Sequence, residues 1–191
     1  MYQKVKTITS FIVALLLLPI LVPIILVFAV LIMLENPGNP IYKQERIGLN
    51  GKKFYIYKLR SMIIDAEKEG AIWAQTNDKR VTTIGKFIRK TRIDELPQIW
   101  NILNGDMHII GPRPEREVFI HEFLKLLPDF NDRLVIKPGI TGWAQVNGGY
   151  DLSVYEKLKY DKEYIAKCNF LMDVKILLLT IRVVLTGHGA R

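Results

Sequence analysis

Two adjacent carboxylates, Asp94 and Glu95, lie between a cationic segment and a predicted helix. The segment Arg89–Arg92 supplies three cations before them, and Pro97 follows shortly after. Proline is tolerated in the first turn of a helix, where its missing N–H would have had no partner. The acid pair is therefore predicted at or just before a helix N-terminus, a place that stabilises negative charge and can bind phosphate through free N–H groups.

These residue types in this order suit phosphoryl transfer. A carboxylate can attack phosphorus and form an aspartyl phosphate, although its charge repels the phosphate oxygens. Arginine or lysine side chains, and a divalent ion held partly by acids, remove that repulsion. The alternative is structural, because Thr91 and Asp94 have the spacing of a capping box, with Glu95 as a solvated acid of the first turn. The pair alone does not decide between the two.

Composition limits the partners and the kinds of site. The chain has 191 residues and a net charge of +8, from 27 Lys and Arg against 19 Asp and Glu. This basic balance favours anionic partners, and a strongly apolar block directs the choice towards membrane lipid rather than nucleic acid. The single cysteine, Cys168, excludes an intramolecular disulfide, and three scattered histidines make a zinc site unexpected.

The apolar block, Phe11–Leu34, contains no charged residue. It is long enough to cross a bilayer core of about 30 Å. A cleaved signal peptide would have a shorter apolar region that ends at a small-residue site, whereas this block runs into the turn-forming segment Glu35–Pro40. The block therefore predicts a helix that stays in the membrane.

Two prolines and the charged flanks bear on how this helix inserts. Pro19 and Pro23 lie in the middle of the block, and each removes a backbone donor. Cations lie on both sides of the block, so the positive-inside rule gives no asymmetry. We therefore predict that residues 1–38 form a re-entrant, kinked membrane helix. A kinked helix that spans the bilayer is the alternative.

Residues 39–191 are predicted to form one domain, α/β mixed, mostly helical with a small sheet. Phe54–Tyr57 follows Asn50-Gly51, a pattern typical of a strand after a hairpin turn. The last apolar stretch, Phe170–Leu185, is expected to lie in the membrane interface, with a core helix as the alternative. Composition and apolar spacing also predict helices over residues 63–69, 81–91, 96–103, 117–127 and 154–167.

Seven short motifs follow one another along the chain. They are Gln44–Gly48 (QERIG), Tyr57–Met62 (YKLRSM), Asp94–Gln98 (DELPQ), Asn104–Met107 (NGDM), Gly111–Pro114 (GPRP), Pro138–Gly142 (PGITG) and Ala144–Gly148 (AQVNG). In this order they resemble the bacterial sugar transferase family, the monotopic phosphoglycosyl transferases that prime polysaccharide and glycan assembly on a polyprenyl phosphate. The resemblance runs from the apolar block to about Asp173.

The resemblance implies a two-step transfer of a sugar-1-phosphate. Asp94 matches the acid that attacks the β-phosphate of a UDP-sugar and releases UMP, after which polyprenyl (undecaprenyl) phosphate takes the sugar phosphate from the enzyme. Glu95 matches the partner acid, and both acids are assigned to Mg²⁺. Pro23, supported by Pro19, matches the proline that breaks the family's re-entrant helix. Substrate or phosphate binding is assigned to Arg113, Arg89, Lys58, Arg60, Lys137 and Gln145.

The resemblance also implies a place in the cell. The active site is expected at the cytoplasmic face of the cell membrane, where UDP-sugars are made, and the product would initiate exopolysaccharide, capsule or glycan synthesis. A homo-oligomer is compatible with the sequence, which does not fix the oligomeric state or the sugar. The alternative for the arginines is a structural ion pair, and for Lys58 and Arg60 it is a solvated strand end.

Three positions depart from the family pattern. Val22 replaces a serine that often precedes the breaking proline, and Lys137 replaces an arginine, which keeps the charge but loses a bidentate contact. Gly149 stands where many members place an arginine.

A second hypothesis is a non-catalytic, membrane-anchored basic module. It uses the apolar block, the positive charge and the basic helix over 81–92, and it treats the acid pair as a helix start. Two-carboxylate glycoside hydrolysis is disfavoured, because it needs acids that face each other across a bond, and the cationic surroundings suit phosphate better than a neutral sugar.

Overall fold

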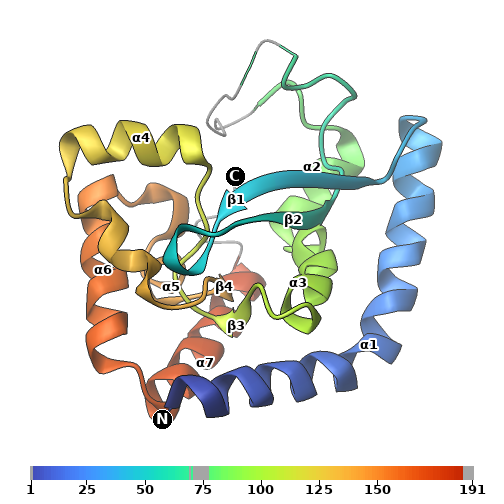
Figure 1. The fold of residues 1–191 in the computed structure, drawn as a ribbon. Helices are drawn as coiled ribbons and strands as arrows, with labels where there is room; N and C mark the ends of the chain where they lie inside the picture. Colours follow the sequence, from blue (N-terminus) through green and yellow to red (C-terminus); the bar gives the residue numbers. More distant parts are fainter. Residues whose placement is uncertain (1, 69, 71–77, 187–191) are drawn as a thin grey trace.

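The computed structural model describes residues 2–68, 70 and 78–186. Its described part is mostly helical, as predicted, but it contains two small two-stranded sheets instead of one (Figure 1). The helices are α1 (Tyr2–Glu35), α2 (Thr83–Lys90), α3 (Ile99–Leu103), α4 (Glu117–Leu126), α5 (Trp143–Val146), α6 (Val154–Lys167) and α7 (Phe170–Thr186). The strands are β1 (Ile41–Ile47), β2 (Lys53–Leu59), β3 (His108–Ile110) and β4 (Gly139–Thr141), and the 3-10 helices are η1 (Leu49–Gly51), η2 (Ile93–Gln98), η3 (Phe130–Val135) and η4 (Gly149–Asp151).

Helix α1 is the long apolar helix that the sequence predicts. Among the described residues it is the one helix long and apolar enough to cross a membrane. It contains Pro19 and Pro23, and Figure 1 shows two arms that meet at a bend, one along the bottom of the molecule and one up its right side. Because each proline breaks the hydrogen bonding of a helix interior, the bend has a local cause.

Both ends of α1 are tied to the rest of the fold. Near its start, the buried Lys6 ammonium contacts Asp173 of α7 at 2.9 Å and also donates to the Tyr164 hydroxyl of α6. At its end, the Glu35 carboxylate accepts hydrogen bonds from the backbone N–H groups of Thr83 and Ile84, at 2.7 and 3.1 Å, in the first turn of α2. The helix is therefore held at both ends by one domain.

The two sheets are short and differ in direction. Strands β1 and β2 form an antiparallel hairpin, with Asn50 and Gly51 in the left-handed region at its turn, as the Asn-Gly pair predicts. Strands β3 and β4 are parallel, and the amide of Gly111, just past β3, donates to the Thr141 carbonyl at 2.8 Å. The predicted strand over 54–57 is confirmed and extends by a residue or two on each side.

Two predicted helices need correction. Residues 64–68 form turns instead of the helix predicted over 63–69, because Asp65 adopts a positive φ of 65°, which a right-handed helix does not allow. Residue 69 lies outside the described residues. The helix predicted over 96–103 is two elements, η2 and α3, since Pro97 lies inside the first of them. The helices predicted over 81–91, 117–127, 154–167 and 170–185 match α2, α4, α6 and α7 within two residues at each end.

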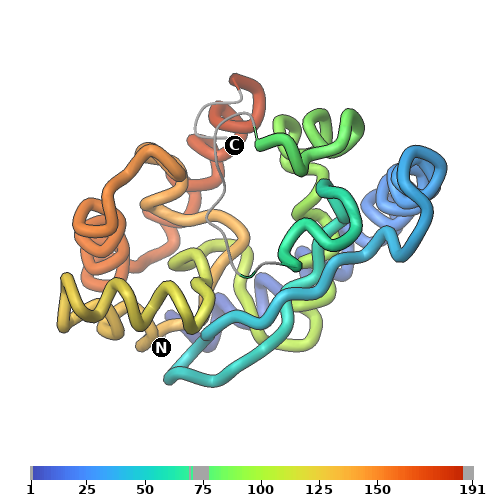
Figure 2. Tube along the Cα trace, turned by 90° about the horizontal axis from the view of Figure 1, so that it is seen from above, coloured from blue at the N-terminus to red at the C-terminus, as the bar shows by residue number. Residues whose placement is uncertain are grey.

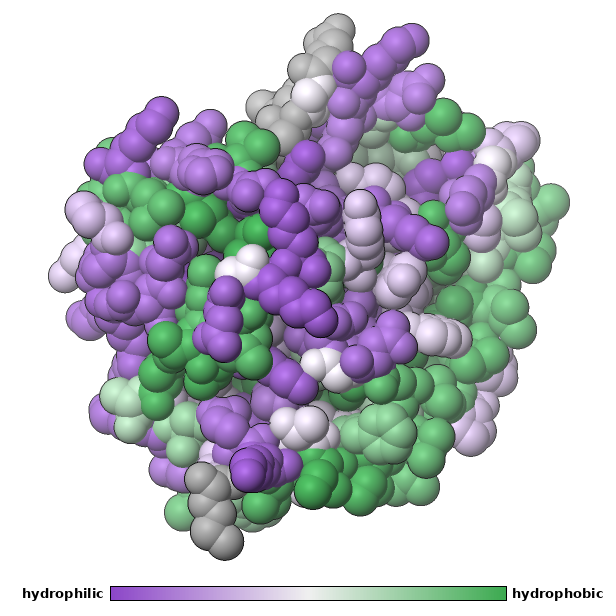
Figure 3. Space-filling view, in the orientation of Figure 1, coloured by the Kyte–Doolittle hydropathy of each residue, from purple (hydrophilic) through white to green (hydrophobic). Residues whose placement is uncertain are grey.

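Apolar side chains gather on the outside of α1 and α7 as well as in the core. Figure 3 shows them along the bottom and right edges of the molecule, where α1 runs. Helix α7 buries Ile176 and Asp173 and leaves the opposite face exposed. Its exposed apolar residues are Phe170, Leu171, Val174, Leu177, Leu178, Ile181, Val184 and Leu185.

Candidate active site

The acid pair lies in η2, immediately after α2. Helix α2 ends at Lys90, and Arg92 then adopts a left-handed conformation with φ of 60°, which turns the chain so that the next residues enter a new helical turn. Asp94 and Glu95 occupy its first turn, as predicted. Both are buried, with 7% and 6% of their surfaces exposed.

The structure does not support the capping-box alternative. The Thr91 hydroxyl donates to the Phe87 carbonyl at 2.8 Å, inside the preceding helix, and no side chain caps the start of η2. Glu95 is buried, where the alternative predicts a solvated acid. Two buried carboxylates that do not cap a helix need another explanation.

Two cations from distant parts of the chain hold the Glu95 carboxylate. Lys58 of β2 donates to Glu95 Oε1 at 2.8 Å, and the Arg113 guanidinium donates to Oε1 and Oε2 at 2.7 and 3.4 Å. Lys58 Nζ also lies 4.0 Å from Asp94 Oδ2. Asp94 Oδ1, although buried, has no hydrogen-bond partner among the described residues. One oxygen of the predicted nucleophile is thus left available.

This arrangement separates the two acids in pKa. Burial raises the pKa of Asp94 to about 6, against the opposing effect of the Lys58 ammonium. Burial also raises the pKa of Glu95, but the Arg113 guanidinium and Lys58 outweigh it and hold that pKa well below its usual range. Glu95 is a permanent anion at neutral pH, and Asp94 is an ionised carboxylate that retains appreciable basicity.

A second group of buried charges supports Arg113. Arg133 donates to the Arg113 carbonyl at 2.7 Å and to Asp161 at 2.8 Å. Next to it, Glu115 contacts Lys157 at 3.2 Å and Arg46 at 3.6 Å. These residues fix the Gly-Pro-Arg-Pro segment that carries the guanidinium. Sequence reasoning missed them, although Arg46 belongs to a motif quoted above.

Tyr150 is a further residue that the sequence analysis missed. Its ring lies under the guanidinium groups of Arg92 and Arg113, at 6.0 and 5.7 Å from the ring centroid, and Arg113 Nη2 lies 3.4 Å from the hydroxyl. The Arg113 cation lowers the pKa of Tyr150 to about 8, against the effect of burial. The tyrosine directly follows Gly149, the position at which many members of the resembling family place an arginine, so a phenol that contacts two arginines lies next to that position.

A cavity of about 1110 Å³ opens at the acid pair. Residues of α7, α2 and the β1–β2 hairpin line this cavity, and Figure 2 shows these three elements around the middle of the molecule, seen from above. Its lining includes seven of the predicted site residues: Lys58, Arg60, Arg89, Asp94, Glu95, Arg113 and Gln145. Gln145 has neither amide atom hydrogen-bonded among the described residues, and Arg60 donates to the Asn36 carbonyl.

Three predicted residues lie elsewhere. Lys137 does not line the cavity; it lies beside Gly105, near His108, and its charge acts on that imidazole. The structure therefore does not bring Lys137 to the acid pair. Pro19 and Pro23 lie inside α1, at the predicted break.

The donor set suits magnesium better than a transition metal. Among residues 2–68, 70 and 78–186, no group of three or more His, Cys, Asp or Glu side chains is placed to hold an ion. Magnesium is usually bound by one or two carboxylates together with substrate phosphates and water. The unpartnered Asp94 Oδ1 is a ligand of this kind. The residues present therefore fit Mg²⁺ bound together with a phosphate substrate.

Comparison with known proteins decides the family. The model of the bacterial sugar transferase family matches residues 1–187. The chain belongs to the bacterial sugar transferase family. It is 45% identical, over its whole length, to UDP-N-acetylgalactosamine-undecaprenyl-phosphate N-acetylgalactosaminephosphotransferase of Aeromonas hydrophila, but it spans only 46% of that protein.

Two further relatives have related names. A putative undecaprenyl-phosphate N-acetylgalactosaminyl 1-phosphate transferase of Bacillus subtilis is 58% identical over 70% of the chain and 74% of the relative. UDP-glucose:undecaprenyl-phosphate glucose-1-phosphate transferase of Escherichia coli is 37% identical over 94% of the chain and 40% of the relative. The chain therefore spans less than half the length of two of these three proteins.

Proposed function

We propose that this protein transfers a sugar-1-phosphate from a UDP-sugar to undecaprenyl phosphate and releases UMP. The observation that carries the proposal is the unpartnered, buried Asp94 oxygen beside a Glu95 that Arg113 and Lys58 hold in place. The family membership and the names of the relatives support the same reaction class.

The first step uses the carboxylate of Asp94. Its oxygen attacks the β-phosphorus of the UDP-sugar, a phosphorus–oxygen bond forms to Asp94, and the bond to UMP breaks. UMP leaves with the electron pair of that bond. Lys58 and Arg113 lie where they can neutralise the phosphoryl oxygens, which removes the repulsion between the carboxylate and the diphosphate.

The second step restores the enzyme. A phosphate oxygen of the polyprenyl phosphate attacks the same phosphorus, and the bond to Asp94 breaks, which gives a diphosphate-linked lipid and the free carboxylate. Asp94 and Glu95 would hold Mg²⁺, which would supply further neutralisation of the phosphates. Glu95 also positions Arg113 and Lys58 for both steps.

We propose that α1 enters the cytoplasmic leaflet and turns back. The support is the bend together with the two tethers, Lys6 to Asp173 and Glu35 to the start of α2. A helix whose two ends bind one domain has both ends on that domain's side of the membrane. The exposed apolar face of α7 would lie in the same leaflet.

The test is release of UMP by the full chain in detergent, with Mg²⁺, undecaprenyl phosphate and a panel of UDP-sugars. UDP-N-acetylgalactosamine is the first candidate, because two of the relatives carry that sugar in their names. Asp94→Asn should lower UMP release at least about 1,000-fold. The control is Glu122→Gln, an exposed acid of α4, which should keep full activity.

Two outcomes contradict the proposal. An active Asp94→Asn protein would exclude Asp94 as the nucleophile. A panel in which no UDP-sugar releases UMP would favour the non-catalytic basic module, whose liposome binding should be salt-sensitive and should survive loss of both carboxylates.

A further inference from the structure

Tyr150 lines the cavity at the acid pair, although no step of the proposed reaction uses its hydroxyl. It belongs to η4, which follows α5 closely. Gly149, the residue before it, has a φ of 59°, in the left-handed region that glycine adopts more readily than arginine. The backbone therefore favours glycine at the position where many family members carry arginine, and the next side chain in the cavity lining is a phenol.

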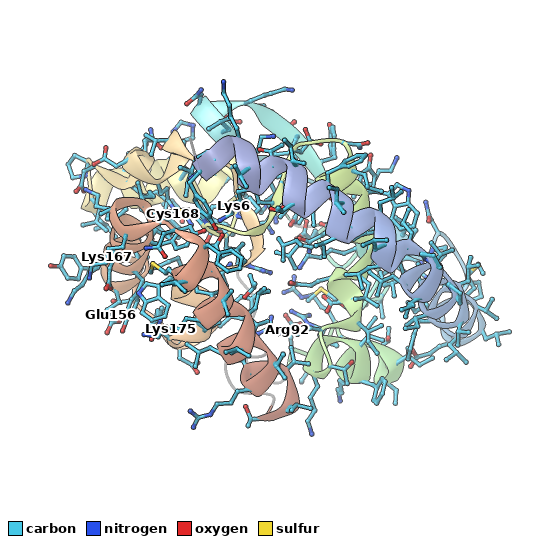
Figure 4. The ribbon with its side chains drawn as sticks, turned by 90° about the horizontal axis from the view of Figure 1, so that it is seen from below. Lys6, Arg92, Glu156, Lys167, Cys168 and Lys175 are labelled. Atoms are coloured by element: carbon cyan, nitrogen blue, oxygen red, sulfur yellow. The ribbon has the colours of Figure 1, made fainter. Side chains whose placement is uncertain are left out.

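Cations outnumber acids among the described groups that act on the Tyr150 phenol. These groups include the cations Arg46, Lys58, Arg92 and Arg113 and the acid Glu95. They come from β1, β2, the start of η2 and the segment after β3, so distant parts of the chain meet at the phenol. Figure 4, a view from below, shows Arg92 in the middle of the molecule, between α7 and the segment that contains α2 and α3. The positive surroundings suit the oxygens of a phosphate.

The Tyr150 hydroxyl retains a proton that it can donate. Arg113 Nη2 lies 3.4 Å from the hydroxyl oxygen, which accepts from it. A phenol both accepts and donates, and no acceptor for the hydroxyl proton lies within hydrogen-bond distance in the part of the chain that the structure describes. The same guanidinium nitrogen donates to Glu95 Oε1 at 2.7 Å. One nitrogen of Arg113 therefore joins the phenol to the acid pair.

An oxygen of the β-phosphate is the ligand that fits this donor. In the proposed reaction Asp94 attacks the β-phosphorus, and Arg113 neutralises the oxygens on it. Because the phenol contacts the same guanidinium, its proton lies beside the same phosphoryl group. Hydrogen bonds to ionised acceptors are stronger than those between neutral groups. A neutral phenol therefore adds a strong contact to the phosphate and introduces no repulsion.

We propose that the Tyr150 hydroxyl donates a hydrogen bond to a β-phosphate oxygen of the UDP-sugar, next to Arg113. The proposal rests on the proposed function and adds a substrate-binding residue to it. The phenol supplies a phosphate donor one position after the residue at which many family members carry an arginine. Only the neutral phenol can donate, so binding of the diphosphate weakens as the phenol ionises.

Nucleotide affinities test which phosphate the phenol contacts. UDP carries the β-phosphate and UMP lacks it, so Tyr150→Phe should weaken UDP binding about tenfold at pH 7 and leave UMP binding unchanged. Both affinities are measured by isothermal titration calorimetry on the full chain in detergent with Mg²⁺. The matched control is Tyr155→Phe, an exposed tyrosine outside the cavity lining, which should change neither affinity. Equal losses of UDP and UMP affinity in Tyr150→Phe, or no loss of either, would overturn the proposal.

The pH dependence separates a donor from a residue that only holds Arg113 in place. A phenolate would hold the guanidinium more tightly than a phenol, so a purely positioning role predicts equal or tighter UDP binding at pH 9 than at pH 7. The donor role predicts binding about tenfold weaker at pH 9, because a pKa of about 8 leaves about a tenth of the phenol neutral there. Tyr150→Phe should lack this loss.

Two further outcomes distinguish this proposal from the proposed function. UDP binding that weakens no more between pH 7 and pH 9 in the unmodified protein than in Tyr150→Phe would overturn the role of the phenol. Absence of UMP release by the unmodified protein would contradict the proposed function, whereas the UDP and UMP affinities decide the role of Tyr150 without turnover.

Discussion

Asp94 and Glu95 are neighbours in the chain, yet Glu95 binds Arg113 at 2.7 Å while Asp94 keeps one buried oxygen without a partner. The difference arises because Lys58 and Arg113 both donate to Glu95, whereas Lys58 lies 4.0 Å from Asp94 Oδ2. Glu95 is thus an anion held in place by two cations, whereas burial makes the ionised form of Asp94 unfavourable.

Asp94→Asn should stabilise the protein at neutral pH without metal. An acid whose pKa is raised in the folded protein binds its proton more tightly there than in the unfolded chain. The contribution of proton binding at Asp94 to the free energy of unfolding is therefore fully present below about pH 4. It is lost as the pH rises through about 6. A shift from 3.8 to about 6 corresponds to roughly 3 kcal/mol.

Thermal unfolding in detergent with EDTA measures this effect. Asp94→Asn should have a Tm several degrees above the unmodified protein at pH 7.5, at about 2–4 °C per kcal/mol, and the difference should vanish near pH 4. Glu122→Gln is the control. A lower Tm for Asp94→Asn at pH 7.5 would mean that the carboxylate is not strained by burial.

Magnesium should reduce this difference in Tm between the unmodified protein and Asp94→Asn. An ion that binds the folded protein stabilises it by roughly 1.4 kcal/mol at ten times its Kd. Mg²⁺ should therefore raise the Tm of the unmodified protein and have less effect on Asp94→Asn, because the unpartnered Oδ1 is then an amide. Sodium chloride at equal ionic strength is the control. Equal stabilisation of both proteins by Mg²⁺ would place the ion elsewhere.

The sequence predicted the acid pair's place at a helix start but not its surroundings. Lys58 and Arg113 come from β2 and from the segment after β3, so their convergence depends on tertiary packing that no local pattern encodes. The helix predicted over 63–69 does not form over its described residues, 63–68, because the left-handed conformation of Asp65 overrides the helical spacing. Tyr150 was missed because Gly149 indicated only the loss of an arginine, not a phenol beside it.

Arg113 and Glu95 should be energetically coupled. Removing one partner of a buried pair leaves an uncompensated charge and costs about 3–5 kcal/mol. Arg113→Met and Glu95→Gln should each destabilise the protein, and the double variant should be more stable than the sum of the two changes predicts. The surface pair Lys162 and Asp129 should give weak coupling in the same cycle. Additive effects at Arg113 and Glu95 would contradict the contact.

Tyr150 should ionise near pH 8. Its pKa is lowered by Arg113, so the phenol is neutral below that pH and becomes a phenolate above it. Ultraviolet difference spectra should reveal one tyrosine that titrates about two pH units below the usual value near 10. Tyr150→Phe should remove that component, whereas Tyr155→Phe, an exposed tyrosine of α6, should keep it. A component that survives in Tyr150→Phe would assign the titration to another residue.

The segments before and after the membrane part of α1 should both be accessible to a chemical label from the cytoplasmic side. Cys168 is the single cysteine, so Cys168→Ser provides a background in which Lys4→Cys and Lys52→Cys report one residue each. A membrane-impermeant maleimide should label both in inverted vesicles and neither in right-side-out vesicles. Labelling of Lys4→Cys from the opposite side to Lys52→Cys would indicate a spanning helix.

The prolines should control this arrangement. Replacing both Pro19 and Pro23 by alanine restores two backbone donors, and each proline costs a helix interior about 3 kcal/mol, so a straight helix becomes favourable. The ties of Lys6 to Asp173 and of Glu35 to α2 cannot both persist on a straight α1, because they hold its two arms on different sides of the bend. In the double variant Lys4→Cys should gain labelling in right-side-out vesicles. Pro40→Ala, outside the helix, should leave the labelling unchanged.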